Sequence, residues 1–385
     1  MKIAFEVLPL INENMSGIGY CEAGLISEII NNHPENAYSL EYFSEGSHYE
    51  KRERLAPYMR ESVKLNESHF SGRFYRTVSS LLPLPYCWFF GGKSQLTHFF
   101  NYIIPPFVKG KKIVTVHDMV IKAYPETVRA RTRYMLSFGL KKSMKRADII
   151  ITDSEFSKRE ITKYYPQFAD KLRVVPCGVN SERFYPIEDK DEIQRVKDSL
   201  GIYGEYFLYL GTIEPRKNLE RLIEAYAKLR DGAENAPLLV LAGGKGWLNS
   251  SIYQRVTELG LKEYVIFTKF VPSEDMCGLM NGALAFTFPS IYEGFGMPPL
   301  EAMACGTPVL ASSEASLPEV TGDCAVQVDA HSVDSIAEGM KRLWLDEELR
   351  RDLSARGLER SKNFTWSNAA KALYSIYEQV LNEKN

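Results

Sequence analysis

The sequence lacks the features that mark several large classes of protein. It has six cysteines in 385 residues and no Cys-x-x-Cys pair, which argues against a disulfide framework and fits reduced thiols. Its six histidines fall at no metal-ligand spacing. No stretch approaches the ~18 uncharged apolar residues of a membrane-spanning helix, and a net charge of −2 argues against nucleic acid as a partner. We therefore expect a cytoplasmic protein that is at most peripheral to a membrane.

Charge is spread unevenly along the chain. Residues 1–176 contain 25 Lys and Arg against 18 Asp and Glu, a net +7, whereas residues 177–385 contain 22 against 31, a net −9. A basic first half suits an anionic acceptor or a membrane surface, although the imbalance is equally explained as incidental. The basic segments 129–133 and 141–146 fall in one predicted helix, whose charged face is either solvated or in contact with anionic lipid.

Short β-branched runs alternate with longer amphipathic segments, which is the pattern of parallel sheets covered by helices. The first residues form too short an apolar run for a signal peptide and are predicted as a strand. The strands expected in the first half are 3–7, 95–98, 112–116, 149–152 and 172–175. The pattern restarts in the second half, with strands expected at 206–210, 238–242, 265–267, 285–288, 309–311 and 325–328.

A chain of 385 residues is too long for one ordinary core, so the sequence predicts two doubly wound α/β domains. We place them at 1–180 and 187–365, with the charged, strandless residues 186–193 between the two series of strands. Ligands of such sheets bind beyond the carboxyl ends of the strands. The site is therefore expected in a cleft between the domains.

Two stretches of the first half have two interpretations each. Residues 45–76 are polar, charged and without periodicity, so they form either a mobile acceptor loop or a partly helical surface insertion. Residues 81–90 are an apolar run in the basic half, suited either to lipid contact or to core packing.

The most informative stretch is 289–308, which carries two carboxylates, Glu293 and Glu301, eight positions apart. Between them a glycine turn leads through Pro298 and Pro299 into a predicted helix, since proline is favoured at the start of a helix. A turn with exposed N–H groups at a helix N-terminus can receive an anion, and carboxylates accept hydrogen bonds from hydroxyls. An anion with hydroxyls describes a sugar nucleotide.

Cationic and imidazole side chains follow two other predicted strands. Arg216 and Lys217 come after strand 206–210, and they can neutralise a diphosphate and stabilise it as a leaving group. Surface charge is the plain alternative. His117 follows strand 112–116, where a histidine can hydrogen-bond a sugar hydroxyl or stabilise charge near the anomeric centre. A structural histidine is the alternative, and Asp118 beside it is explained as a cap of the next element.

The first glycine-containing loop lies between the first strand and a helix expected to start near Cys21. Its Gly17 and Gly19 allow a close approach of the backbone to a ligand. Glu22 stands where the third glycine of a G-x-G-x-x-G fingerprint belongs, so a dinucleotide-binding interpretation is weak.

The second glycine-containing loop follows strand 238–242. Gly243 and Gly244 would admit a nucleobase or phosphate, although a simple tight turn explains them as well. The sequence Asp189-Lys-Asp191 has the D-x-D spacing of another class of sugar transferases, but it lies in the charged linker. We therefore expect no metal.

Together these motifs resemble the retaining glycosyltransferases of family 4, which have the GT-B fold of two Rossmann-like domains facing a central cleft. The paired glutamates match the family's E-x7-E motif, and the whole set is similar to the mannosyltransferase-like branch that builds bacterial surface polysaccharides. The resemblance also implies that the last helix, within 366–385, packs back onto the first domain. Other segments that carry the resemblance are the N-terminal glycine loop, His117-Asp118, 151–157, 175–180 and 214–217.

The resemblance also implies roles for single residues. Arg216 and Lys217 would bind the donor diphosphate, Glu301 the ribose hydroxyls, and Glu293 the donor sugar, with His117 at the reacting face. The expected catalytic set is His117, Glu293, Arg216 and Lys217. Thr212 stands where family members often carry an arginine, so the phosphate contacts differ there. With the second glycine loop added, the predicted donor-binding residues are Gly17, Gly19, Gly243, Gly244, Gly294, Phe295, Gly296, Met297 and Glu301.

The expected activity is that of a retaining, metal-independent hexosyltransferase without a cofactor. The resemblance favours mannose from GDP-mannose as the group transferred, to a glycan or lipid-linked acceptor in surface polysaccharide synthesis. A UDP-linked donor stays open, because the residues do not fix the base or the sugar. A sugar-nucleotide epimerase on the same fold and a non-catalytic sugar-nucleotide-binding protein are the alternatives.

Overall fold

The chain forms two compact domains. An N-terminal domain consists of Met1–Gly178 with Trp366–Asn385, and a C-terminal domain consists of Val179–Thr365. The first boundary between the two domains, after Gly178, thus lies two residues before the boundary predicted at residue 180. No helix among the described residues is long and apolar enough to cross a bilayer. This computed structural model describes residues 1–12, 15–46, 48–72, 74–75, 78, 84–233, 235–244, 246 and 250–383.

The N-terminal domain is built on a seven-stranded parallel sheet with the order β3-β2-β1-β4-β5-β6-β7. The first six positions follow the 3-2-1-4-5-6 order of Rossmann-like domains. Its strands are β1 (Lys2–Glu6), β2 (Ala37–Phe43), β3 (Val63–Ser68), β4 (Leu96–Phe99), β5 (Lys111–Thr115), β6 (Ile149–Thr152) and β7 (Leu172–Val174). Its helices are α1 (Gly17–Asn32), α2 (His48–Leu55), η1 (Ala56–Tyr58), α4 (Cys87–Phe90), α5 (Val120–Ala123), η2 (Pro125–Thr127), α6 (Ala130–Arg146), α7 (Glu155–Tyr164), η3 (Pro166–Lys171) and α16 (Trp366–Asn382).

The C-terminal domain repeats this plan with a six-stranded parallel sheet in the order β10-β9-β8-β11-β12-β13. Two Rossmann-like sheets were predicted and are confirmed. The strands are β8 (Tyr206–Leu210), β9 (Leu238–Ala242), β10 (Val265–Lys269), β11 (Ala285–Phe288), β12 (Val309–Ser312) and β13 (Ala325–Val328). The helices are α8 (Lys190–Ser199), η4 (Pro215–Lys217), α9 (Leu219–Arg230), α10 (Ser250–Glu258), α11 (Met276–Asn281), α12 (Met297–Ala304), α13 (Leu317–Thr321), α14 (Val333–Leu345) and α15 (Glu347–Ser361).

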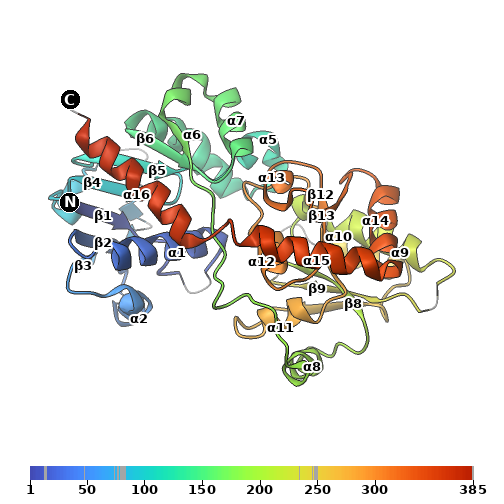
Figure 1. The fold of residues 1–385 in the computed structure, drawn as a ribbon. Coiled ribbons are helices and arrows are strands. Elements are labelled where there is room, and N and C mark those ends of the chain that lie inside the picture. Colours follow the sequence, from blue (N-terminus) through green and yellow to red (C-terminus); the bar gives the residue numbers. More distant parts are fainter. Residues whose placement is uncertain are drawn as a thin grey trace. The chain divides into compact units, whose positions relative to one another are not determined.

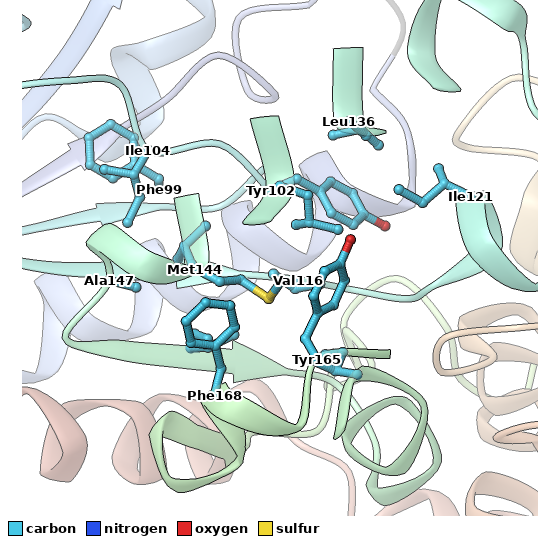
Figure 2. Packing of buried hydrophobic residues seen from close by; sticks show 14 of the residues in the cluster. Phe99, Tyr102, Ile104, Val116, Ile121, Leu136, Met144, Ala147, Tyr165 and Phe168 are labelled. Atoms are coloured by element: carbon cyan, nitrogen blue, oxygen red, sulfur yellow. The ribbon is translucent and has the colours of Figure 1, made fainter. Parts of the chain in front are cut away.

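An apolar cluster fills one side of the N-terminal sheet. Figure 2 shows side chains from β4, α6 and η3 meeting there, among them Phe99, Met144 and Phe168. On α6 the buried residues Leu136 and Leu140 recur with Met144 at intervals of four, which is the apolar stripe of an amphipathic helix. This packing fixes the strands whose carboxyl ends carry the histidine of the candidate site.

The last helix belongs to the N-terminal domain, as the resemblance implied. Figure 1 shows α16 lying across this domain beside α1. A side chain on Gly24 of α1 would come within 2.2 Å of Trp366, so the two helices touch there. The Tyr377 hydroxyl is also 2.6 Å from Nδ1 of the buried His98 of β4. The C-terminal segment is therefore tied to the sheet by both packing and hydrogen bonding.

Two strands of the N-terminal sheet were missed in the sequence. Segment 37–43 is β2, and β3 lies within residues 45–76, which were expected to hold a loop or a partly helical insertion. The described part of 45–76 contains α2, η1 and β3, so these residues are not the irregular loop of the first interpretation, and contact with an acceptor stays a prediction. Ser47, Arg73, Arg76 and residues 81–83 of the apolar run 81–90 lie outside the described residues.

Candidate active site

Two loops of the C-terminal domain meet at the carboxyl ends of β8 and β11, which are neighbours in the sheet. One loop is η4, which carries both predicted cations, and the other is 289–296. The Ile291 N–H donates to the Arg216 carbonyl at 3.0 Å, and the Ser290 hydroxyl oxygen lies 3.1 Å from the same carbonyl. In return, Arg216 Nη1 donates to the Tyr292 carbonyl at 2.9 Å. The two segments therefore form one connected unit.

The Glu293 carboxylate is the centre of this unit. Its Oε2 lies 2.9 Å from Arg216 Nη1, and its Oε1 lies 2.6 Å from Lys217 Nζ. The Ser290 hydroxyl donates to Oε1 at 2.5 Å. Arg216 has a second acidic partner, because its Nε lies 2.7 Å from Oε1 of Glu214. Both cations are thus paired with carboxylates inside a nearly closed environment.

The charges of this group perturb one another's pKa values. Burial alone would raise the pKa of Glu293, but the positive charges of Arg216 and Lys217 hold it at about 2. Burial, together with the charge of Arg216, lowers the pKa of Lys217. Glu293 is therefore ionised at neutral pH, with both oxygens already bonded. Such a carboxylate is a poor nucleophile and a good holder of cations.

The glycine turn after Glu293 has a conformation that other residues rarely adopt. Gly296 has a φ of +118°, and a Cβ there would lie 2.7 Å from Leu317 Cδ2. The Ser316 hydroxyl lies 2.6 Å from the Phe295 carbonyl and 3.0 Å from the Glu293 carbonyl, and this contact holds the turn in place. Helix α12 then begins directly after Gly296, as the two prolines predicted.

The predicted residues of the turn do not all offer side chains to a ligand. Phe295 is buried, and its ring packs 5.9 Å from that of Phe364. Its contribution to a ligand site would come from its backbone. Met297 is the first residue of α12, where backbone N–H groups lack partners within the helix.

Glu301 of α12 differs from Glu293 in its partners. Within the described part of the chain, its carboxylate forms no hydrogen bond and no ion pair. Burial raises its pKa to about 7, against the opposing charge of Arg183. A half-buried carboxyl group with no partner among the described residues is suited to accept hydrogen bonds from ligand hydroxyls.

His117 lies in the N-terminal domain, two residues after β5, and both of its ring nitrogens are bonded. Nδ1 is 2.7 Å from Oδ2 of Asp153, and Nε2 is 2.8 Å from the Phe100 carbonyl. Burial opposes the positive charge, but Asp153 and the Phe100 carbonyl raise the pKa of His117 to about 9. His117 is therefore a buried imidazolium at neutral pH.

This geometry limits what His117 can do. Two acceptors already occupy its two N–H groups, so it can stabilise negative charge through space but has no spare N–H for a sugar hydroxyl. Asp118 accepts from the Tyr102 hydroxyl and from the Val120 N–H, each at 3.1 Å. It caps the next element, as the sequence suggested.

The N-terminal glycine loop is already helical. Helix α1 begins at Gly17, four residues before the predicted start near Cys21. A Cβ on Gly17 would meet nothing within 4 Å, whereas one on Gly19 would lie 3.1 Å from the Pro9 carbonyl. Because α1 starts at Gly17, its first-turn N–H groups lack partners within the helix, and such a helix N-terminus can bind an anion.

The second glycine loop has a structural explanation. A Cβ on Gly243 would lie 2.0 Å from the Gly211 carbonyl, so glycine is needed where β9 ends against β8. Gly244 has open space around it. The tight-turn interpretation therefore suffices for Gly243, and a donor contact there stays a prediction. The Asp189 carboxylate accepts the Asp191 N–H at 2.9 Å and caps α8, so the D-x-D sequence is a helix start.

Comparison with known proteins decides the family. Residues 94–183 match the profile named Glycosyltransferase Family 4, and residues 192–360 match that named Glycosyl transferases group 1. The O-antigen chain mannosyltransferase B of Escherichia coli is 34% identical over 288 residues, covering 74% of each chain. The chain belongs to glycosyltransferase family 4. This glycosyltransferase is also 33% identical over 283 residues to the serotype-specific mannosyltransferase WbdA of E. coli, of which it spans only 34%.

Solved structures show the same fold for this glycosyltransferase. Sucrose-phosphate synthase from Thermosynechococcus elongatus superposes over 100% of both chains with a TM-score of 0.73 and 21% identity. HepE of Anabaena, solved with UDP and glucose, superposes over 98% of this chain and 100% of its own with a TM-score of 0.74 and 17% identity. The predicted GT-B fold is therefore confirmed. The central cleft stays a prediction.

The structure brings three predicted residues of this glycosyltransferase together: Arg216, Lys217 and Glu293. The sequence analysis missed their support, Ser290 and Glu214, and it missed Asp153 as the partner of His117. The pairing register of the two strands could have identified Asp153 as the partner of His117. Ile113 of β5 pairs with Ile149 of β6, an offset of 36 residues, and His117 and Asp153 are 36 residues apart beyond the same strands.

Proposed function

We propose that this glycosyltransferase transfers mannose from GDP-mannose to a glycan acceptor, with retention of configuration at the anomeric carbon. The observation that carries the proposal is the buried group Arg216, Lys217 and Glu293 at the carboxyl ends of β8 and β11. It supplies two cations where a doubly wound sheet binds ligands. The choice of mannose and of a polysaccharide product follows the names of the relatives, which are 34% and 33% identical over 74% and 71% of this chain.

In this proposal, Arg216 and Lys217 bind the donor diphosphate. They exchange part of their contact with Glu293 for phosphate oxygens and neutralise the charge that develops as the bond from the anomeric carbon to phosphate breaks. Glu301 accepts hydrogen bonds from the ribose hydroxyls. Glu293 and the backbone of 294–297 hold the sugar.

Retention follows when the acceptor hydroxyl attacks from the face that the diphosphate leaves. The departing phosphate oxygen takes the proton of that hydroxyl, so no protein base is needed on the other face. The bonded oxygens and the low pKa of Glu293 support a role in positioning over one as a covalent nucleophile. The imidazolium of His117 would add positive charge near the reacting face.

The same two cations are the reason to propose that transfer needs no metal ion. A divalent cation commonly neutralises a transferring or departing phosphate group, and Arg216 with Lys217 supplies two positive charges in its place. Transfer should therefore persist in excess chelator.

The acceptor is proposed to be lipid-linked, with the enzyme bound peripherally at the inner face of the membrane. Helix α6 supports this part. Its exposed face carries Tyr134, Met135 and Phe138, which are 68%, 43% and 60% exposed. Exposed basic residues flank them, including Arg131 and Lys142. Aromatic side chains beside basic ones favour the interface of an anionic bilayer.

The experiment that tests the function is a donor screen followed by transfer. GDP-mannose should raise the melting temperature more than UDP-glucose, UDP-galactose or GDP alone, since a bound donor stabilises the fold by mass action. The enzyme should then transfer mannose to a mannose-terminated oligosaccharide, with an α-linked product detected by NMR. Consumption of GDP-mannose without any acceptor, giving an epimer, would contradict the proposal.

A further inference from the structure

Three metal-ligating side chains meet in the N-terminal domain, at the β3 edge of its sheet. His48 is the first residue of α2, Glu67 is in β3, and His69 follows that strand. Their ligand atoms, one from each residue, lie within 4.8 Å of one another. Sequence spacing did not show this group, because α2 and β3 bring together residues that are 21 positions apart.

The distances suit one small cation. His48 Nδ1 lies 3.1 Å from His69 Nδ1, and Glu67 Oε1 lies in contact with His48 Nδ1 and 3.8 Å from His69 Nδ1. Two nitrogens bound to one tetrahedral zinc at 2.0–2.1 Å are about 3.3 Å apart. The separation of the two histidine nitrogens is close to this spacing, whereas the Glu67 oxygen lies nearer to His48 and farther from His69 than a shared ion would place it, so binding the ion needs a small shift of these side chains.

The surroundings orient the ligands and leave the site open. Arg52 donates to the other oxygen of Glu67 from Nε at 3.0 Å and Nη2 at 2.7 Å, and Ser44 also hydrogen-bonds this carboxylate, so its position is fixed with Oε1 beside the two histidines. The Glu67 side chain is only 6% exposed, while those of His48 and His69 are 41% and 73% exposed. A fixed carboxylate with two accessible imidazoles leaves the fourth position of a tetrahedral ion to water.

We propose that His48, Glu67 and His69 bind a divalent transition-metal ion, with zinc as the expected ion. The donor set of two imidazoles and one carboxylate suits zinc better than magnesium or calcium, which prefer oxygen ligands. The bound ion joins the start of α2 to the segment that follows β3. This inference goes beyond the proposed function and does not depend on it.

The place in the sheet assigns the ion a structural role. Strands β2, β1 and β4 separate β3 from β5, whose end leads to His117. Four spacings of 4.7–4.9 Å put these strand ends about 19 Å apart. The ion therefore stabilises the β3 edge of the N-terminal domain, away from the strand end that leads to His117.

The test is zinc titration of the untagged, full-length protein after chelator treatment, against a chromophoric competitor. The wild type should bind one zinc ion at this site, and H48A and H69A should each weaken binding at least about tenfold. R52Q, which removes the guanidinium that holds Glu67, should weaken zinc binding by about 10–100-fold. H331A, which removes an exposed histidine of the other domain, is the matched control and should bind like the wild type.

Cobalt separates this site from the buried cysteines. Cys21, Asp153 and Cys177 form a second close group, whose thiolates would give an intense ligand-to-cobalt charge-transfer band. The proposed site should give only the weaker visible bands of nitrogen and oxygen ligation, lost in H48A. Melting curves show whether each variant folds, and zinc should raise the melting temperature of the wild type but not of H69A. Equal zinc binding by wild type, H48A and H69A would overturn the proposal, as would no binding by the wild type.

Discussion

The two domains have the same strand order, but they hold their charged residues in different ways. In the C-terminal domain, Arg216 and Lys217 share the carboxylate of Glu293, a partner of opposite charge from a neighbouring loop. In the N-terminal domain, His117 is bonded on one side to Asp153 and on the other to the Phe100 carbonyl. Both sites follow neighbouring strands of a parallel sheet.

The difference shows which site can change partners. A phosphate group can replace part of the Glu293 contact with the two cations, because a guanidinium carries five N–H donors and an ammonium three. His117 has two N–H groups and both are used. We therefore propose that the C-terminal site exchanges partners for an anion, whereas the N-terminal histidine supplies a fixed positive charge.

Removing the two cations should have the largest effect. For the Arg216→Ala/Lys217→Ala double variant we expect turnover to fall by at least about 10²–10³-fold, the loss typical of one preorganised donor. The initial rate of mannose transfer from GDP-mannose measures this. Full activity in the double variant would contradict the proposal that these two side chains bind the donor diphosphate.

A matched variant separates chemistry from folding. Lys217→Ala alone leaves Glu293 buried with one cation fewer, and breaking a buried pair costs about 3–5 kcal/mol. Lys217→Met/Glu293→Gln removes both charges together and should recover much of the free energy of unfolding, measured in urea. Its turnover should stay low. Recovery of turnover along with stability would mean that the single variant was inactive because it unfolded.

Removing the partner of His117 should have the next largest effect. In Asp153→Asn the pKa of His117 should fall from about 9 towards its ordinary value near 6.5, because the negative charge is gone. Turnover should then fall at a lower pH than in the wild type, by about tenfold at pH 8. The pH–rate profile and the NMR titration of the imidazole test this together.

The same pair makes a prediction for stability. The pKa of His117 is raised in the folded protein, so its contribution is fully present below about pH 6.5 and is lost as pH rises through about 9. Asp153→Asn should lose that dependence. Wild-type and Asp153→Asn curves of unfolding free energy that run parallel from pH 6 to 10 would show that His117 is not charged.

A smaller effect is expected at Glu301. Its pKa of about 7 means that the carboxylate forms as pH rises from 6 to 8, and the ionised group accepts hydroxyl hydrogen bonds more strongly. The affinity for GDP-mannose should therefore rise by up to about tenfold over this range. Glu301→Gln should bind more weakly and show little pH dependence. Calorimetric titration at three pH values measures it, and a wild-type affinity that falls with pH would contradict the ribose assignment.

The smallest effect on turnover is expected from α6. Tyr134→Ser/Phe138→Ser should leave transfer to a soluble acceptor within about twofold, because these side chains face solvent. Binding to vesicles with anionic lipid should weaken at least tenfold, since burying each aromatic is worth about 1.5–3 kcal/mol. Tyr203→Ser, which removes a 75% exposed tyrosine of the C-terminal domain, is the control. Equal binding of all variants to vesicles would contradict membrane contact through α6.

The two domains also differ in how far the sequence predicts them. Every strand of the C-terminal sheet was found, because β8, β9, β11 and β12 are short, largely buried, apolar runs and the partly exposed β10 and β13 still carry β-branched residues. In the N-terminal domain β3 was missed, since Lys64, Asn66 and Glu67 give it a polar pattern. An edge strand has one neighbour and needs less apolar surface. Strand β2 was missed as well, because the charged residue Glu41 interrupts its apolar pattern. In the structure Glu41 is buried and accepts a hydrogen bond from the Tyr86 hydroxyl.

Side-chain pairing was harder to predict than position. The sequence placed Glu293 and the Arg216-Lys217 pair after strands, but their contact depends on β8 and β11 being neighbours. The early start of α1 was also missed, because Gly17 lowers helix propensity. The second glycine of this segment, Gly19, packs closely against the Pro9 carbonyl.

The central claim is that Arg216 and Lys217 bind the diphosphate of a nucleotide donor. Calorimetric titration of the wild type and the Arg216→Ala/Lys217→Ala variant with GDP, GMP and guanosine tests it most directly. We predict that the wild type binds GDP much more tightly than GMP or guanosine, and that the variant binds all three with similar, weak affinity. A variant that binds GDP as tightly as the wild type would contradict the account.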